Sequence, residues 1–345
     1  MKQINFRDFF MKKLVIVFQP EDVGMSAKDF FSTYASYVTD IGIVGKRPSG
    51  YTLYPSKTAP VEAQHNQFFQ DWVKLASALS MNSAVSMDFY TDGWFARDPK
   101  YQTVTSKGQA MKHQICPNHE EFWQYGAEIV RELGAYPISE ILLFGTGFIR
   151  DQFCFCERCR NEFAPKVGQE PKRLTYDYIA ENPDYLSLWH RWRTEKVVSG
   201  ISQLQAAARD ADQKAGRAEP LRLSVETILD PETGLSEGAK NEYGYDYVKF
   251  GDITHSLLIN LFPWSPLLPR KGSKEYNDLV ESLYFVNEFK RKGGRVSLFR
   301  WGVTTMEHLD ELRVLGKDAG IDRIVTTFHY PGDYSARREA AVRSY

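Results

Sequence analysis

The sequence predicts an α/β fold, a (β/α)8 TIM barrel. Short apolar segments alternate with amphipathic segments along the chain, which is the order expected of a parallel sheet covered by helices. Eight apolar segments occur, and eight such units suggest a closed barrel. The alternative, an open doubly wound sheet, would need a phosphate loop or a G-x-G-x-x-G turn after its first strand, and QPEDVGMSA (19–27) contains neither.

The expected strands are short and nearly continuous apolar runs, of the kind that a parallel sheet buries on both faces. KLVIVFQ (13–19) is the first of them. In chain order we expect strands at 13–19, 42–46, 83–90, 138–146, 221–229, 253–264, 294–302 and 323–330.

Helical periodicity fills most intervals between these strands. We expect helices at 26–41, 61–81, 119–136, 186–211, 276–293 and 305–320, followed by a helical C-terminus. Ser26 is placed to cap the first helix, and Asn118 is placed to cap the third. No low-complexity segment or obvious linker interrupts the pattern, so we expect residues 1–345 to form one barrel domain.

The composition narrows the classes of partner. The chain carries a net charge of −1, so no excess charge attracts nucleic acid or an anionic membrane. No apolar run reaches the roughly 18 residues of a membrane-spanning helix. The N-terminal segment 1–18 mixes charged with apolar residues and has no small-residue cleavage site, unlike a signal peptide. We therefore expect a soluble, cytoplasmic protein; a homo-oligomer is compatible with this composition.

All four cysteines belong to one part of the chain. Cys154, Cys156 and Cys159 form C-x-C-x-x-C, and Cys116 lies upstream in the preceding segment. Three sulfurs this close can converge on one point, and the fourth could complete a tetrahedron. Zn²⁺ favours four thiolates in closed structural sites, so the spacing predicts a zinc ion bound by these four residues. Such a site has no open coordination position, and its metal would be structural.

Other interpretations of the cysteines are weaker. Disulfides are poorly suited to a cytoplasmic chain. A redox C-x-x-C would open a helix in a thioredoxin-like unit and would need no third cysteine. Four unrelated core cysteines would not cluster in this way. An iron–sulfur cluster also uses four cysteines, and the ligand set does not distinguish it from zinc.

Several segments resemble a group of glycoside-hydrolase-like barrels. In that group an ICPN-like segment precedes the fourth strand, and a C-x-C-x-x-C-x-x-x-F loop follows it. Here DGWFARDPKYQTVTSKGQAMKHQICPNHEEFWQYGAEIVREL (92–133) and CFCERCRNEF (154–163) match this pattern. LWHRWRTEKV (188–197), YGYDYVKFGDITHSLLINLF (243–262) and FRWGVTTMEHLDEL (299–312) also resemble the group. The resemblance covers most of the chain, from SAVSMDFY onward.

The cysteine arrangement is similar to that of the zinc-containing β-galactosidases of glycoside hydrolase family 42. Those enzymes bind zinc through one upstream cysteine and a C-x-C-x-x-C, and they are (β/α)8 barrels of the large retaining-glycosidase clan. The resemblance implies a zinc-clamped region around 112–160, in which the loop after strand four is fastened to the segment before the preceding helix.

The catalytic carboxylates of those β-galactosidases are missing from the matching positions. Their acid/base Glu follows an Asn at the end of strand four, where this chain has Thr146 and Gly147. An Asp often ends this strand in the more similar barrels, and here that position holds Gly145. The clan's nucleophile lies at strand seven, where this chain has Arg300 and Trp301. The usual β-galactosidase mechanism is therefore not expected.

Other carboxylates lie at the predicted C-terminal ends of strands, where barrel active sites are built. Glu226, in LSVETIL, is the best catalytic candidate, because a carboxylate in an apolar strand must be paired, hydrogen-bonded or functional. Asp88 ends strand three and Asp151 follows strand four. A turn cap or an ion pair with Arg150 would also account for Asp151. Asp92, in TDGW, has the pattern of a turn residue.

Further side chains at strand ends could line a sugar pocket. Trp264 and Trp301 are the expected stacking platforms, although either could instead close the barrel core. Arg300 would bind an anionic group or a site carboxylate. His329 could bind a sugar hydroxyl or be a hydrogen-bonded core histidine. The complete set of substrate-binding candidates is Gln19, Arg150, Asn260, Trp264, Arg300, Trp301, His329 and Tyr330.

These residues predict a glycoside hydrolase that cleaves a glycosidic bond in an oligosaccharide or glycoconjugate by paired-carboxylate chemistry. The alternative is a non-catalytic carbohydrate-binding barrel that has lost the catalytic pair. A zinc-dependent hydrolase is a third, weaker hypothesis, because it needs an open three-ligand site. Two carboxyl groups about 5–10 Å apart across a pocket would favour the enzyme. A lone Glu226 bonded to Arg300 would favour the binding protein.

Overall fold

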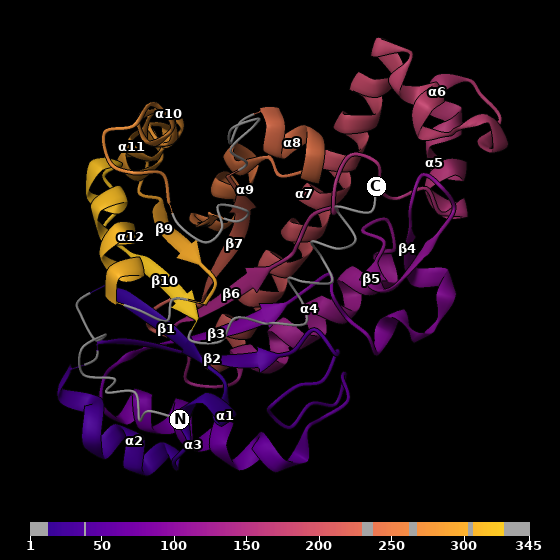
Figure 1. Ribbon diagram of the computed structural model, residues 1–345. Coiled ribbons are helices and arrows are strands. Elements are labelled where there is room, and N and C mark those ends of the chain that lie inside the picture. Colours follow the sequence, from indigo (N-terminus) through magenta and orange to yellow (C-terminus); the bar gives the residue numbers. More distant parts are fainter. Residues whose placement is uncertain (1–12, 38, 230–236, 262–267, 303–305, 328–345) are drawn as a thin grey trace.

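Eight parallel strands close into a barrel in the computed structural model, which describes residues 13–37, 39–229, 237–261, 268–302 and 306–327 (Figure 1). Around the barrel the strand order is β1-β10-β9-β8-β7-β6-β3-β2. The predicted fold class is confirmed, and each predicted strand overlaps one of these eight. Their bounds are β1 (Leu14–Phe18), β2 (Asp40–Lys46), β3 (Asn82–Asp88), β6 (Glu140–Phe144), β7 (Arg222–Ile228), β8 (Ser256–Asn260), β9 (Arg295–Arg300) and β10 (Ile324–Thr327).

Helices surround the barrel (Figure 1). The longest, α7, packs against α4 and continues beyond the barrel to contact α5 and α6. In the described part of the chain, no helix combines the length and apolar content that crossing a bilayer requires. The helices are α1 (Pro20–Val23), α2 (Ala27–Tyr34), α3 (Asn66–Ala78), α4 (Glu120–Gly134), α5 (Glu157–Val167), α6 (Tyr176–Ala180), α7 (Pro183–Ala215), α8 (Glu237–Tyr243), α9 (Tyr247–Thr254), α10 (Lys274–Ser282), α11 (Phe285–Arg291) and α12 (Met306–Asp318).

Some predicted boundaries are wrong. The strand predicted from residue 253 begins at Ser256, because the two residues before His255 end α9 and His255 adopts the left-handed conformation, with φ 53°. The helix predicted at 276–293 is divided into α10 and α11, and the helix predicted at 26–41 ends at Tyr34. The predicted C-terminal helix lies outside the described residues.

The two predicted helix caps have different outcomes. Ser26 caps α2 as expected, since its Oγ accepts a hydrogen bond from the backbone N–H of Asp29 at 3.1 Å. Asn118 does not cap α4, whose N-cap residue is His119. The amide of Asn118 instead donates to Sγ of Cys159 at 2.8 Å. The Asn118 side chain therefore binds the cysteine cluster and does not cap α4, contrary to the prediction from the local sequence pattern.

Apolar side chains fill the middle of the barrel. Strand residues alternate between the barrel interior and the helix layer, so every second residue faces inward. The inward cluster comprises Val15, Val17, Ala84, Leu142, Phe144, Leu258, Phe299 and Val325. Below it, at the N-terminal end of β6, the buried Glu140 accepts hydrogen bonds from Arg323 at 2.5 and 3.1 Å. Burial raises the pKa of Glu140, but Arg323 and the Ser224 hydroxyl outweigh it and hold the pKa below its ordinary value.

A small antiparallel hairpin between β3 and α4 was not predicted. Its strands are β4 (Gln102–Val104) and β5 (Ala110–Ile115), and they lie beside α5 at one flank of the barrel (Figure 1). The backbone N–H of Phe155 donates to the carbonyl of Val104 at 2.8 Å, and Thr105 forms a β-bridge with Phe153. The hairpin therefore holds the loop that follows β6, and this contact brings the distant cysteines together.

Candidate active site and metal centre

Glu226 is buried on β7 with both carboxylate oxygens hydrogen-bonded. Oε2 accepts from the backbone N–H of Gly145 at 2.5 Å, and Oε1 accepts from Nδ2 of Asn260 at 2.5 Å. The Glu226 side chain is almost completely buried, with 1% exposed. Gly145 has a φ of 64°, a conformation that favours glycine over the Asp often found there in similar barrels. The carboxylate is thus oriented from strands on both sides.

Asp88 lies in the same lateral row of the barrel as Glu226. Asp88 pairs with Phe144 in the register of β3 and β6, while Leu143 pairs with Val225 in the register of β6 and β7. Phe144 is therefore the lateral neighbour of both carboxylate residues. Two strand spacings put the Cα atoms of Asp88 and Glu226 on the order of 10 Å apart.

Both residues of this row face the barrel interior. Glu226 pairs laterally with Leu258, which belongs to the inward cluster, and Asp88 lies four residues after the inward-facing Ala84. Because the side-chain period of a strand is two, Asp88 and Glu226 share the inward face with Phe144. The row stands near the C-terminal ends of β3, β6 and β7, the end of the barrel where active sites are built.

A buried lysine that sequence reasoning missed supports the segment after β3. Lys46 ends β2, and its Nζ donates to the backbone carbonyl of Asp88 at 2.8 Å and pairs with Oδ2 of Asp92 at 3.0 Å. Both side chains of this ion pair are fully buried. Oδ1 of Asp92 accepts from the backbone N–H of Phe95 at 2.7 Å, so Asp92 also stabilises the turn that its sequence pattern suggested. The only local signal for Lys46 is a cation at the end of an apolar strand.

Asp151 belongs to a second polar group beyond β6. The hydroxyl of Tyr176 donates to Oδ2 of Asp151, and Nε1 of Trp189 donates to its backbone carbonyl at 3.1 Å. Within the described residues we find no ion pair between Asp151 and Arg150. Glu242 lies nearby, and burial followed by the charge of Asp151 raises its pKa. The sequence did not single out Glu242, because it comes from a helix 91 positions away and its proximity depends on tertiary structure.

The fully buried Arg193 joins this group to the neighbouring loop. Its guanidinium donates to the carbonyls of Asn241 at 2.8 Å and Glu242 at 3.0 Å, and also to the carbonyl of Arg150. The loop after β6 is thus fixed to α8, which follows β7. Nothing in the local sequence around Arg193 indicates this role, because the three carbonyl groups come from distant segments.

The other substrate-binding candidates lie in different layers. Arg300 pairs with Glu311 of α12, with 3.4 Å between Nη1 and Oε2, so its side chain faces the helices. Trp301 is partly exposed and packs on the inward cluster, with ring centroids 4.9 Å from Phe144 and 4.8 Å from Phe299. Gln19 precedes α1 at the end of β1. Trp264, His329 and Tyr330 lie outside the described residues.

Gly147, where the resemblance to the β-galactosidases would place an acid/base glutamate, is sterically closed. A Cβ atom on Gly147 would lie 2.4 Å from the carbonyl oxygen of Tyr243 and 2.4 Å from the ring of Tyr245. The backbone N–H of Gly147 donates to the hydroxyl of Tyr245 at 3.1 Å. This packing leaves no room for a side chain at the position, so the departure from the β-galactosidase pattern is built into the fold.

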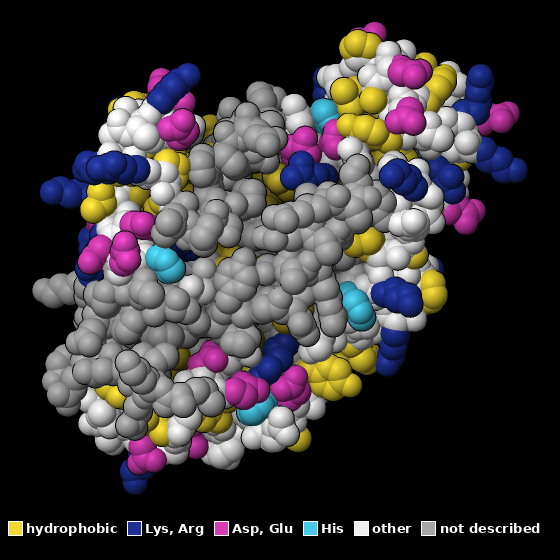
Figure 2. Space-filling view, viewed as in Figure 1, with side chains coloured by type: hydrophobic (Ala, Val, Ile, Leu, Met, Phe, Trp, Pro, Cys, Tyr) yellow, Lys and Arg dark blue, Asp and Glu magenta, His cyan; other side chains and the backbone are white. Residues whose placement is uncertain are grey.

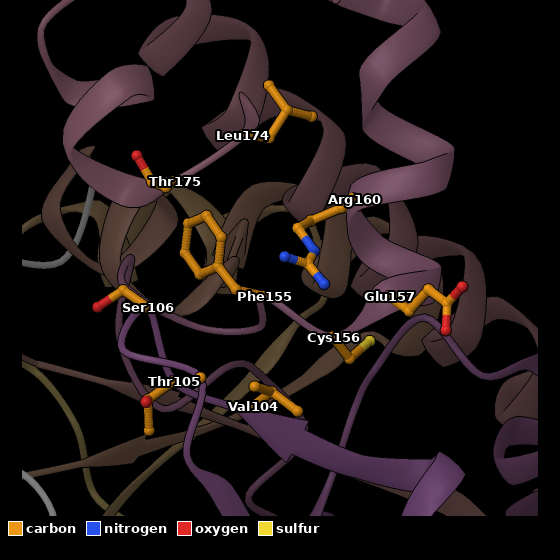
Figure 3. Close-up of a pocket in the computed structure, with 10 residues that line it drawn as sticks. Val104, Thr105, Ser106, Phe155, Cys156, Glu157, Arg160, Leu174 and Thr175 are labelled. Atoms are coloured by element: carbon orange, nitrogen blue, oxygen red, sulfur yellow. The ribbon is translucent and has the colours of Figure 1, made fainter. Parts of the chain in front are cut away.

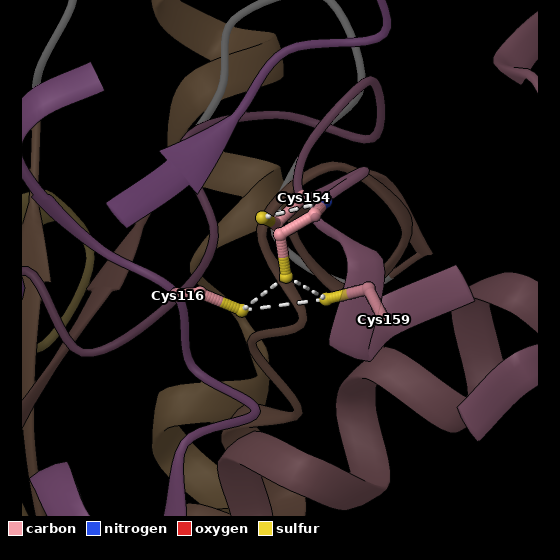
Figure 4. Close-up of side chains that lie close together, drawn as sticks. Cys116, Cys154 and Cys159 are labelled. Carbon is pink, nitrogen blue, oxygen red and sulfur yellow. Dashed lines mark hydrogen bonds between the residues drawn. The ribbon is translucent and has the colours of Figure 1, made fainter. Parts of the chain in front are cut away.

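The four cysteines converge, as their spacing predicted (Figure 4). Their Sγ atoms all lie within 4.8 Å of one another, and all four residues are free and buried. The Sγ–Sγ distances are 3.3 Å for Cys116–Cys159, 3.4 Å for Cys156–Cys159 and 3.7 Å for Cys116–Cys156. A disulfide would hold two sulfurs at about 2.05 Å, whereas a Zn–S tetrahedron has edges of about 3.8 Å. The disulfide alternative is therefore wrong, and the cluster is compatible with a metal site.

Donors around the sulfurs support thiolate ligands. The backbone N–H of Val104 donates to Sγ of Cys154 at 3.1 Å, and Asn118 donates to Cys159. Burial raises the pKa of Cys116 and of Cys159, whereas hydrogen bonds from the neighbouring cysteines, that of Cys116 foremost, lower the pKa of Cys156. Donors of this kind orient metal ligands and stabilise their charge.

The charged residues on the face shown in Figure 2 are mixed in sign. Dark-blue Lys and Arg side chains are interspersed with magenta Asp and Glu side chains around the part of the surface that is not described. No large field of one charge is visible on this face, consistent with the net charge of −1.

Solved structures similar to this chain include glycoside hydrolases. The catalytic domain of a β-amylase from Paenibacillus polymyxa matches with a TM-score of 0.62 at 12% identity, covering 97% of this chain and 99% of that one. A β-galactosidase from the psychrophilic Marinomonas ef1 matches with a TM-score of 0.61 at 12% identity, covering 92% of this chain and 54% of that one. An α-L-fucosidase isoenzyme 2 from Paenibacillus thiaminolyticus matches with a TM-score of 0.60 at 15% identity, covering 92% of this chain and 46% of that one.

The similarity is one of fold. This chain spans nearly all of the β-amylase domain but about half of the other two proteins. Neither a protein-family model nor a curated protein sequence matches it. At these identities the comparisons show the barrel of glycoside hydrolases and leave activity and catalytic residues to be argued from the site.

Proposed function

We propose that the protein is a glycoside hydrolase acting on an oligosaccharide or glycoconjugate, with Glu226 as one catalytic carboxylate. The observation that carries this proposal is the inward-facing row of Asp88, Phe144 and Glu226 near the C-terminal ends of their strands. Two carboxylates on one face of a barrel are the minimum that glycosidic bond cleavage normally requires.

Glu226 suits the role of base or nucleophile. Two donors, Gly145 and Asn260, are directed at its oxygens and hold the carboxylate in one orientation. Asp88 or Asp151 would then protonate the leaving-group oxygen. The Cα atoms of Asp88 and Glu226 lie ~10 Å apart on either side of Phe144, and both side chains face the barrel interior.

Trp301 is proposed as a sugar-stacking platform. It is partly exposed above the aromatic pair Phe144 and Phe299, and the apolar face of a sugar ring packs well on such a surface. Asn260 could contact substrate as well as Glu226, since it ends β8 in the same part of the barrel. Gln19, Arg150, Trp264, Arg300, His329 and Tyr330 stay as proposed substrate-binding residues.

We propose that the metal of the cysteine cluster is Zn²⁺ with a structural role. The cluster consists of Cys116, Cys154, Cys156 and Cys159, and four thiolates are the ligand set that closed zinc sites favour. A bound ion would fasten the loop after β6 to the segment before α4. This arrangement supports the resemblance to the zinc-containing β-galactosidases of glycoside hydrolase family 42.

A carbohydrate-binding protein is the second candidate. The observation that favours it is that both oxygens of Glu226 are already engaged by protein donors. The closed position at Gly147 is a second departure from an active glycosidase of the compared clan. The pairing expected of a binder was Glu226 with Arg300, but the ion pair of Arg300 is with Glu311.

Turnover separates the two candidates. The wild-type protein is incubated with a broad panel of aryl glycosides and oligosaccharides, and sugar binding is followed in parallel by thermal stabilisation. Release of product from any member supports the glycosidase. Stabilisation by sugars without turnover on the whole panel would contradict it and support the binding protein.

A further inference from the structure

A small polar pocket lies beside the cysteine cluster, at the flank of the barrel (Figure 3). Its volume is about 200 Å³. Three segments meet there, the turn of the β4–β5 hairpin, the start of α5 and the segment before α6. The proposed catalytic carboxylates do not line it. The lining consists of Val104, Thr105, Ser106, Gly108, Phe155, Cys156, Glu157, Arg160, Leu174 and Thr175.

Arg160 supplies an unpaired cation to this pocket. Its Nε is buried without a hydrogen-bond partner, and its side chain makes no hydrogen bond or ion pair with another described residue. Arg158, on the same helix, pairs with Glu162 at 2.9 Å and Glu121 at 3.3 Å. Figure 3 shows the Arg160 guanidinium between the ring of Phe155 and Cys156, while the carboxylate of Glu157 points away from it.

Arg160 is not the only cation near the negatively charged cysteine cluster, because Arg158 also lies close to it. Arg158 already interacts electrostatically with Cys116. Burial, the largest influence, lowers the pKa of Arg158, but the hydrogen bond that Arg158 donates to Glu162 and the nearby negative charges outweigh it, so the pKa is raised. The guanidinium of Arg160 lines the cavity with no hydrogen-bond partner among the described residues. A guanidinium fork matches a planar carboxylate in a bidentate pair.

The hydroxyl groups of the lining also favour an acceptor-rich ligand. Oγ1 of Thr105 accepts hydrogen bonds from the backbone N–H groups of Lys107 at 3.2 Å and Gln109 at 3.1 Å. Oγ1 of Thr175 accepts one from Tyr178 at 3.2 Å. Each hydroxyl therefore keeps its own proton for donation to another group.

An aromatic ring completes the lining. Phe155 stacks on Trp189, with ring centroids 4.9 Å apart and an angle of 27° between the rings. The ring also contributes to the pocket wall, where it offers an apolar contact for a C–H surface. The volume of about 200 Å³ is below the roughly 300–1,000 Å³ of ordinary ligand sites, so one small molecule would fill it.

We propose that this pocket binds a small acidic sugar, of hexuronic acid size, whose carboxylate pairs with Arg160. The cation matches the carboxylate, the Thr105 and Thr175 hydroxyls match sugar oxygens, and Phe155 matches the apolar ring face. The site lies outside the barrel interior, so the proposal holds whether the barrel is an enzyme or a binding protein.

Calorimetric titration of the metal-loaded full chain tests this site. The probes are glucuronate, its neutral counterpart glucose, and sodium acetate and sodium sulfate as simple oxyanions. The proteins are the wild type, Arg160→Gln and, as matched control, Arg209→Gln on the exposed face of α7. We expect glucuronate to bind the wild type and Arg209→Gln equally, and to bind Arg160→Gln at least about tenfold more weakly, as loss of a charge-assisted pair predicts.

Specific results would overturn the proposal. Unchanged glucuronate affinity in Arg160→Gln, or no binding of glucuronate to the wild type, removes the site. Glucose binding as tightly as glucuronate removes the role of the carboxylate, and acetate or sulfate binding as tightly removes the role of the sugar. If Arg160→Gln loses its metal or fold, Arg160→Lys replaces it, because Lys keeps the charge but loses the bidentate fork. Unchanged glucuronate affinity in Arg160→Lys then contradicts the proposal.

Discussion

Nδ2 of Asn260 donates a hydrogen bond of 2.5 Å to Oε1 of Glu226, across the pairing of β7 with β8. The two residues are 34 positions apart and both are buried in the barrel. Glu226 is held on its other side by the N–H of Gly145. Under the proposed function, Asn260 therefore orients a catalytic carboxylate.

Substitution Asn260→Ala should slow turnover more than it weakens substrate binding. A hydrogen bond to a charged group contributes about 1.5–3 kcal/mol, which corresponds to a loss of roughly 10- to 150-fold in kcat. KM should change little if Asn260 acts through Glu226. Steady-state kinetics of the variant measures both constants, with the exposed Asn277→Ala as control. A raised KM with unchanged kcat would instead make Asn260 a substrate ligand.

The buried ion pair at the opposite end of the barrel should control stability and leave activity alone. Glu140→Gln leaves the buried charge of Arg323 uncompensated, which costs about 3–5 kcal/mol in the free energy of unfolding. Urea denaturation measures this loss. The exposed pair of Asp310 with Arg313 provides the control, because Asp310→Asn should cost less than about 1 kcal/mol. Equal costs for the two variants would contradict the assignment.

The same pair predicts a dependence of stability on pH. Burial raises the pKa of Glu140, but Arg323 and Ser224 outweigh it, so the folded pKa is below the ordinary value of 4.5. A carboxyl group with a lowered folded pKa contributes its stability above the unfolded pKa and loses it as the pH falls through the folded value. The advantage of the wild type over Glu140→Gln should therefore be constant above about pH 5 and shrink in acid. Urea denaturation curves of both proteins across this pH range measure the advantage. An advantage that grows in acid would contradict a stabilising ion pair between Glu140 and Arg323.

Removing the metal of the cysteine cluster should loosen the flank of the barrel. A chelator, or the substitution Cys159→Ser, should lower Tm by on the order of 5–10 °C, because the ion stabilises only the folded state. Metal analysis should find one zinc per wild-type chain and much less in the variant. Turnover well below Tm should persist, as expected of a structural ion. A metal-free wild type with unchanged Tm would contradict the zinc proposal.

The fold could be predicted because its signals are local. All five residues of β1 are buried, and the sequence shows this directly as LVIVF. The cysteine cluster could be predicted equally well, since three of its four cysteines fall within 154–159. The boundary between α9 and β8 was less clear, because a short apolar run does not distinguish helix from strand. His255 separates α9 from β8 by adopting a positive φ, and the sequence gives no signal for that conformation.

The partners of the candidate site could not be predicted, because they depend on strand register. The hydrogen bond between Asn260 and Glu226 needs β7 and β8 to be aligned, and the ion pair of Lys46 with Asp92 needs β2 beside β3. Asn118 shows the opposite error. Its local pattern indicated a helix cap, but the distant Cys159 binds its amide.

The comparison that tests the central claim most directly is the kcat/KM of the wild type against that of Glu226→Gln, on the best substrate of the glycoside panel. Gln keeps the shape of the side chain and removes its charge. If Glu226 is a catalytic carboxylate, kcat/KM should fall by at least about a thousandfold, equivalent to roughly 4 kcal/mol, while the fold and metal content stay unchanged. Wild-type turnover that survives in Glu226→Gln would contradict the account and move the chemistry to other residues.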